Sequence, residues 1–94
     1  MKKFMFFLPL IALLVPVPTS AATLQNTDSQ AYELQIQDAG RSYASHYRIV
    51  ENAQVEICFY GCEITMLRTG QTVTVNPKDS VVIDSGVMSV TPGD

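Results

Sequence analysis

The sequence predicts an all-β protein, a small antiparallel β-sandwich of about seven short strands preceded by a cleaved signal peptide. Three observations support this prediction. Short runs of alternating or β-branched apolar residues follow one another from Tyr32 towards the C-terminus. Turn-forming residues separate these runs at short and even spacing. No segment beyond residue 22 has the apolar period of an amphipathic helix.

The first 22 residues have the parts of a secretory signal peptide in the expected order. Lys2 and Lys3 form a positive segment, and an apolar segment follows at residues 4–15. We expect cleavage after Ala22, with cleavage after Ala21 as the near alternative. The apolar segment has 12 residues. A membrane-spanning helix needs about 20, so we expect release of the chain and no membrane insertion after cleavage.

Without residues 1–22, 72 residues remain, which is enough for one domain. We expect residues 23–31 to be a flexible leader, because they are polar and lack an apolar period, and residues 32–94 to form the β-sandwich. Four basic residues face nine acidic ones in this part, a net charge of −5. The chain lacks the basic stripe that binds phosphates, so we expect no nucleic-acid partner. The expected location is periplasmic or secreted.

The expected strands follow one another in order along the domain. The first has alternating apolar and polar residues, with Tyr32, Leu34 and Ile36 on one face. The expected strands lie at residues 32–37, 43–50, 55–57, 64–66, 72–75, 80–83 and 87–90. The expected turns lie at residues 38–40, 51–53, 59–61, 68–70, 76–79 and 84–86. Glycine stands late in four of these turns, as tight hairpin connections require.

The only two cysteines, Cys58 and Cys62, lie between two expected strands. On one straight strand their Cα atoms would be about 13 Å apart. A disulfide accepts about 4.4–6.8 Å, so the chain must turn between them, and Gly61 suits that turn. Outside the cytoplasm such a pair favours a stabilising disulfide. Thiol–disulfide exchange is less favoured, because no helix follows and Glu56 and Glu63 would raise the pKa of the thiols.

This disulfide is expected to close a β-hairpin. Pairing Ile57 with Ile64 and Val55 with Met66 places four apolar side chains on one face. A symmetric register that pairs the two cysteines is the alternative. At the tip of either hairpin stand Phe59 and Tyr60, where solvent-facing residues are usually polar.

The cysteines also allow a metal site as the alternative. Cys58 and Cys62 with His46 and Met66 (or Met88) would form a soft ligand set suited to copper. His46 is the only histidine and stands on a separate expected strand. We expect no enzymatic activity, no catalytic residues and no cofactor on the first interpretation, with copper as the cofactor on the second.

Several segments give the chain a resemblance to small exported bacterial β-sandwich proteins of unknown function, which have a Cys-x-x-Gly-Cys loop and are loosely cupredoxin-like. The segments that carry the resemblance are Asn26-Thr27-Asp28, residues 32–36, Val55-Glu56-Ile57-Cys58, Gly61-Cys62, residues 70–73 and Val82-Ile83-Asp84 with Gly86. The resemblance implies a β-sandwich outside the cytoplasm and no particular activity. A cupredoxin binds copper with two histidines, and this chain has one.

Taken together, these features predict an exported binding or structural module of unknown partner. Its Cys58–Cys62 disulfide would stabilise the fold. Phe59 and Tyr60 are the expected contacts with another exported protein or an envelope component, since aromatic side chains suit such contacts.

Overall fold

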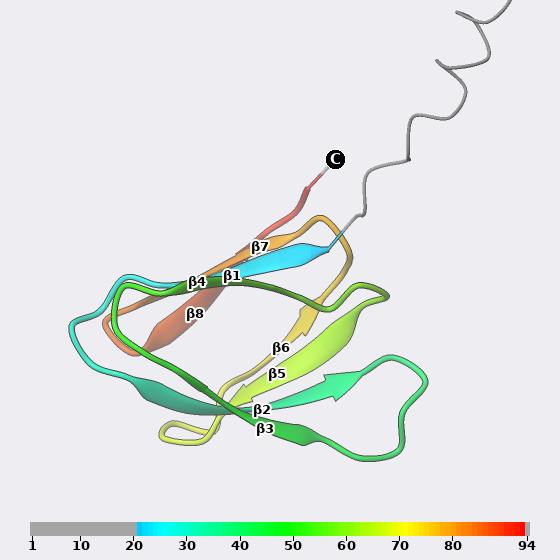
Figure 1. Cartoon of the computed structure of the whole chain (residues 1–94), viewed down its shortest axis with the longest axis horizontal. Coiled ribbons are helices and arrows are strands. Elements are labelled where there is room, and N and C mark those ends of the chain that lie inside the picture. Colours follow the sequence, from blue (N-terminus) through cyan, green and yellow to red (C-terminus); the bar gives the residue numbers. More distant parts are fainter. Residues whose placement is uncertain (1–20, 94) are drawn as a thin grey trace, which may run out of the picture.

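The computed structural model describes residues 21–93, and the predicted signal peptide lies almost entirely outside this range. Two four-stranded sheets face each other, so the predicted all-β sandwich is confirmed (Figure 1). The described part contains eight strands: β1 (Ala22–Asn26), β2 (Tyr32–Asp38), β3 (Ser45–Ile49), β4 (Gln54–Ile57), β5 (Cys62–Met66), β6 (Thr72–Val75), β7 (Ser80–Asp84) and β8 (Val87–Thr91). Within these residues no helix is long and apolar enough to cross a membrane.

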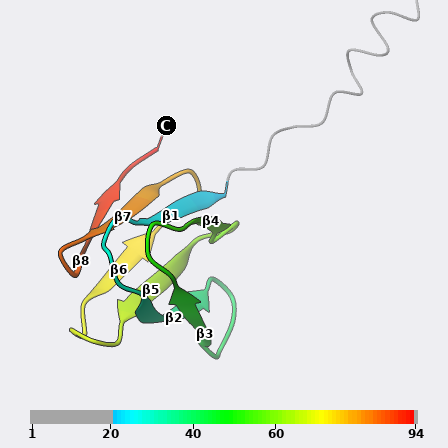
Figure 2. The same cartoon turned by 60° about the vertical axis from the view of Figure 1, so that its left-hand side comes forward.

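One sheet has the strand order β4-β1-β7-β8 and the other β3-β2-β5-β6 (Figure 2). All neighbours are antiparallel except β1 and β7, which run parallel with Leu24 opposite Val81. The chain makes three hairpins, β2–β3, β5–β6 and β7–β8. All of the remaining connections between these strands pass from one sheet to the other. Such repeated crossing joins the two sheets into one body.

The prediction of a flexible leader at residues 23–31 is wrong for its first half. Residues 22–26 form β1, a central strand hydrogen-bonded to β4 on one side and β7 on the other. Its inward row is Ala22, Leu24 and Asn26, all fully buried. The asparagine at the third inward position interrupts the alternation of apolar and polar residues that would indicate a strand. The first inward residue, Ala22, belongs to the predicted signal peptide. The strand therefore shows only one large apolar residue in the sequence.

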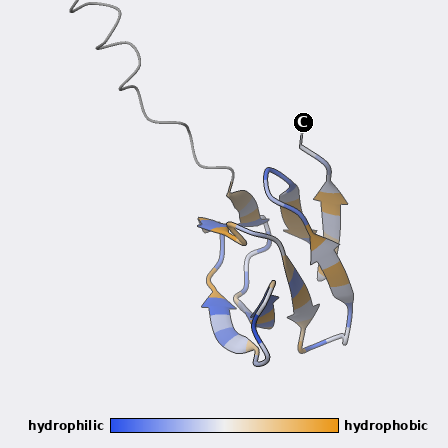
Figure 3. Cartoon of the chain, turned by 90° about the vertical axis from the view of Figure 1, so that its right-hand side faces the viewer, coloured by the Kyte–Doolittle hydropathy of each residue, from blue (hydrophilic) through white to orange (hydrophobic). Residues whose placement is uncertain are grey.

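The core lies between the inner faces of the two sheets. Figure 3 shows hydrophobic and hydrophilic residues alternating along the strands, as a sheet with one wet face requires. On β2 the alternation is as predicted, with Tyr32, Leu34 and Ile36 buried. The fully enclosed apolar side chains are Leu24, Leu34, Ile49, Ile64, Met66, Val75, Val81 and Ile83.

The predicted hairpin around the cysteines is also wrong. β4 pairs with β1, with Val55 opposite Leu24, whereas β5 pairs with β2 and β6, with Ile64 opposite Ile36. The cysteine loop is therefore a crossing between the two sheets. The expected register placed the apolar residues of both strands on one face of a single hairpin. These residues do face the core, but those of β4 and those of β5 belong to opposite sheets. The sequence does not reveal β1, the true pairing partner of β4, so the hairpin with β5 is the pairing that the sequence pattern favours.

Connections gather at the two ends of the sandwich. The disulfide end, on the right in Figure 1, is formed by residues 39–44, 58–61 and 76–79. The Asp28 end, on the left, is formed by residues 27–31, 50–53, 67–71 and 85–86. Each end carries a cluster of polar or aromatic side chains, described below.

One glutamine joins the sheets along their β6 and β8 edges. The Gln71 side-chain amide donates to the Met88 carbonyl at 2.8 Å and accepts from the Met88 N–H at 2.8 Å. The side chain thus forms hydrogen bonds with the N–H and the carbonyl of Met88 on edge strand β8, as the backbone of a neighbouring strand would. Exposed strand edges invite pairing with other chains, and this amide blocks one such position.

Candidate functional site

The loop at the disulfide end is held by three constraints. A disulfide joins Cys58 and Cys62, whose Cα atoms are 5.2 Å apart, within the range that a disulfide accepts. The Gly61 N–H donates to the Cys58 carbonyl at 3.2 Å and closes a β-turn. The Ala39 N–H donates to the Gly61 carbonyl at 3.0 Å and ties the loop to the β2–β3 connection. The loop is therefore fixed to both sheets.

Phe59 and Tyr60 are the two central residues of this turn. Tyr60 is 86% exposed and Phe59 is 48% exposed. Both line a shallow cavity of about 320 Å³ with Asp38, Ala39 and Arg41. Tyr60 also borders a second cavity of about 390 Å³, which extends to β5 and β6. A nearly free aromatic ring thus stands between two hollows on a rigid turn.

Arg41 extends this aromatic surface along the β2–β3 connection. Its guanidinium donates to the Tyr43 hydroxyl at 2.7 Å and lies over the Tyr43 ring, 5.8 Å from the centroid. Tyr43 is 57% exposed. The disulfide end therefore presents three exposed aromatic rings and one cation, groups that are enriched in protein interfaces.

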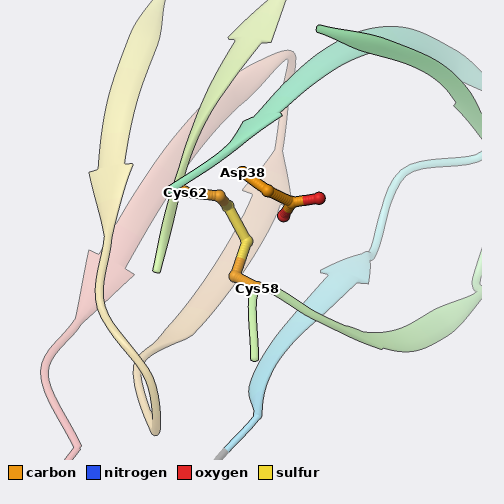
Figure 4. A group of neighbouring side chains, drawn as sticks. All are labelled: Asp38, Cys58 and Cys62. Carbon is orange, nitrogen blue, oxygen red and sulfur yellow. A yellow bond between two sulfur atoms is a disulfide. The ribbon is translucent and has the colours of Figure 1, made fainter. Parts of the chain in front are cut away.

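An acidic residue that was not expected in the site lies beside the disulfide. Asp38 ends β2 directly opposite Cys62 in β5, so the two side chains point to the same face. Ligand atoms of Asp38, Cys58 and Cys62 all lie within 4.8 Å of one another (Figure 4). Both cysteines are buried and Asp38 is half-buried. These are the residues at this end that could hold a metal ion if the disulfide were opened.

The ligand set expected for copper is not brought together. Met66 stands four residues beyond Cys62 on β5, about 13 Å away along a strand, and is fully buried in the core. His46 lies exposed on the outer face of β3, where its Nε2 is 2.7 Å from a Glu33 oxygen. Met88 is buried on β8, in the other sheet from Cys62. The side chain that lies beside the two cysteines is that of Asp38, and not that of His46 or Met66 as expected for copper.

At the opposite end, Asp28 closes the β7–β8 turn. Its carboxylate accepts from the Ser85 N–H at 2.7 Å, the Gly86 N–H at 2.9 Å and the Tyr32 hydroxyl at 2.5 Å. These donors, the Tyr32 hydroxyl foremost, hold the pKa of the Asp28 carboxyl below its ordinary value of 3.8. The bond to Asp28, together with burial of the ring, raises the pKa of Tyr32 above its ordinary value of 10.0.

Asn26 joins this end to the β3–β4 connection. Its side chain is fully buried and donates to the Gln30 carbonyl at 2.8 Å and the Val50 carbonyl at 3.2 Å. Its oxygen accepts from the Asp28 N–H at 2.9 Å. The Asn-x-Asp segment singled out in the sequence therefore fastens two connections of the sandwich, which is a structural role.

Asp38 could have been found from the sequence. The inward row Tyr32, Leu34 and Ile36 reaches position 38 at its next step of two, which points an acidic side chain inward at the strand end. Its closeness to the cysteines needs the pairing of β2 with β5, which no local pattern shows.

Comparison with protein-family models, with characterised proteins and with solved structures finds no match to this chain. What stands of the resemblance noted in the sequence is its structural part, a small all-β domain with a Cys58–Cys62 pair.

Proposed function

We propose that the chain is an exported binding module whose contact surface is the disulfide end, centred on Phe59 and Tyr60. The observation that carries this proposal is the 86% exposure of Tyr60 on a turn fixed by a disulfide and two backbone hydrogen bonds. An aromatic ring held in place loses little conformational entropy on binding and buries a large area. Such rings are the side chains that most often dominate binding energy.

The partner is an exported protein or an envelope component. A disulfide is compatible with export, because thiols stay reduced in the cytoplasm. The acidic balance of residues 23–94 argues against nucleic acid. The proposal includes no enzymatic activity.

The burial of Ala22 bears on how the module is released. Ala22 is fully buried and stands opposite Ile57 in the β1–β4 ladder. Cleavage after Ala21 keeps this residue in the strand, whereas cleavage after Ala22 removes it. We therefore favour the cut after Ala21, and the intact mass of the purified protein distinguishes the two.

A binding experiment tests the proposed surface. A photo-crosslinking amino acid is placed at position 60 in one sample and at Val87, which is 53% exposed on β8, in another. We expect one adduct of defined mass in the envelope fraction from position 60 and none of that mass from position 87. The double variant Phe59→Ser with Tyr60→Ser should lose binding to that partner once purified. Unchanged binding, or the same adduct from both positions, would refute the proposal.

A second candidate function is the handling of a thiophilic metal ion by the two cysteines, as considered in the sequence for copper. One observation favours it, the Asp38 carboxylate within 4.8 Å of both sulfurs. This function requires the reduced form of the loop. Equal metal binding by the reduced wild type and by the Cys58→Ser variant would contradict it.

A further inference from the structure

We infer that reduction of the Cys58–Cys62 disulfide creates a site for a zinc-type divalent ion, with Asp38 as the third ligand. This inference deepens the second candidate function and is independent of the binding surface at Phe59 and Tyr60. The geometry that points to it is the convergence of one carboxylate, from the end of β2, and two sulfurs, from the cysteine loop (Figure 4).

The placement of Asp38 is unusual for an acidic residue. It continues the inward row of β2, and its cross-strand partner is Cys62. None of the side-chain hydrogen bonds or ion pairs among residues 21–93 involves the Asp38 carboxylate. No buried side-chain oxygen among the described residues lacks a partner, so the unpaired oxygens of the half-buried Asp38 are open to solvent. Its oxygens are therefore available as ligands.

The distances suit a tetrahedral ion. Zinc binds thiolate sulfur at about 2.3 Å and carboxylate oxygen at about 2.0–2.2 Å, so ligand atoms around it lie about 3.5–3.8 Å from one another. The three ligand atoms already lie within 4.8 Å of one another. Once the S–S bond is broken, the two sulfurs have to separate to about 3.8 Å, which rotation of the two side chains can provide.

The identity of the ion follows from the donor set. Two thiolates and one carboxylate combine soft and hard donors, a mixture that favours zinc over the copper(I) ion that a cysteine–methionine set would select. Asp38 and Cys62 also line the cavity of about 390 Å³ at this end, which opens a path from solvent. With three protein ligands, a fourth position stays open for water or a partner's side chain.

The chemical step balances with an external dithiol as reductant. Two electrons and two protons pass from the dithiol to the S–S bond, so that the reductant becomes a disulfide and Cys58 and Cys62 become thiols. Binding of the divalent ion then releases both thiol protons to solvent. Two thiolates and the Asp38 carboxylate give the occupied site a net charge of −1. The oxidised chain offers no thiolate, so redox state decides whether the ion binds.

The test uses Co²⁺ as a spectroscopic probe for zinc. Oxidised protein and protein reduced with a phosphine are freed of reductant without oxygen and titrated with Co²⁺. We expect one equivalent to bind to the reduced protein with thiolate-to-cobalt charge-transfer absorption, and none to the oxidised protein. Asp38→Asn should weaken Co²⁺ binding about 10-fold or more. The matched control is Glu63→Gln, which removes the same charge one residue from Cys62 on the exposed face of β5 and should change nothing.

A second measurement covers the case in which reduction unfolds the chain. Circular dichroism and thermal melting of the reduced protein are recorded with and without Zn²⁺. We expect Zn²⁺ to raise the melting temperature of the reduced wild type, or to refold it, and to leave Asp38→Asn unchanged. No Co²⁺ band, equal affinity of wild type and Asp38→Asn, or no effect of Zn²⁺ on folding would overturn the inference. Crosslinking from position 60 of the oxidised chain tests the proposed binding surface independently of the metal site.

Discussion

Replacing Asn26 by alanine should remove a large part of the folding free energy. The side chain is fully buried and makes three well-formed hydrogen bonds, to the Gln30 carbonyl at 2.8 Å, the Val50 carbonyl at 3.2 Å and the Asp28 N–H at 2.9 Å. Each bond contributes about 1 kcal/mol net, so the variant should lose about 3 kcal/mol. A domain of this size has roughly 4–11 kcal/mol in total.

The assay is urea unfolding followed by far-ultraviolet circular dichroism, since the chain has no tryptophan to report by fluorescence. The loss should appear as a lower urea midpoint with an unchanged slope. In a thermal scan it corresponds to a melting temperature lowered by about 12–24 °C. The control is Gln25→Ala, an exposed neighbour on β1, which should change stability by less than about 0.5 kcal/mol. A loss below about 1 kcal/mol for Asn26→Ala would refute the assigned role.

Three further predictions concern other contacts. Reducing the Cys58–Cys62 disulfide should lower the free energy of unfolding by about 2 kcal/mol, the chain-entropy value for a loop of this length, measured by urea unfolding with and without reductant. Gln71→Ala should cost about 1–2 kcal/mol, because two bonds to strand β8 are lost, and should increase self-association in light scattering. Stability should fall as the pH is lowered below about 4, and Asp28→Asn should flatten this dependence in acid unfolding scans.

The sign of the pH effect follows from the direction of the shift. The folded-state pKa of Asp28 lies below its ordinary value, so its contribution is complete above that value and is lost as the pH falls through the folded-state pKa. Asp84→Asn, an exposed carboxyl on β7, should leave the acid dependence as it is in the wild type. Gln35→Ala, exposed on β2, is the control for Gln71 and should not raise scattering. Equal stability of reduced and oxidised protein would contradict the first of these predictions.

The strands with strict alternation could be predicted from the sequence, and the strand with a polar inward residue could not. Tyr32, Leu34 and Ile36 define β2 by themselves, because each inward position is apolar. β1 has Asn26 at an inward position, and one of the carbonyls that make this burial favourable belongs to Val50, 24 residues away in the β3–β4 connection. A local pattern does not contain such a partner.

The candidate site divides in the same way. The exposure of Phe59 and Tyr60 and the bond between the cysteines follow from their own segment, since a turn of that length leaves few alternatives. Asp38 reaches the sulfurs through the β2–β5 register. Met66 lies at the other end of β5 from Cys62 because the two residues are four positions apart on one strand.

The central position of β1 has a consequence for the order of folding. β1 is the first strand among residues 21–93, yet its parallel partner β7 begins at Ser80, and the Asp28 carboxylate binds the amides of Ser85 and Gly86, 57 and 58 residues away. Contacts of such long range form slowly, because a large loop must close first. A chain threaded through a membrane channel from its N-terminus therefore cannot complete its first sheet until the last hairpin has emerged. Under the proposed export, this topology leaves the β4-β1-β7-β8 sheet incomplete for as long as the channel holds the C-terminal hairpin.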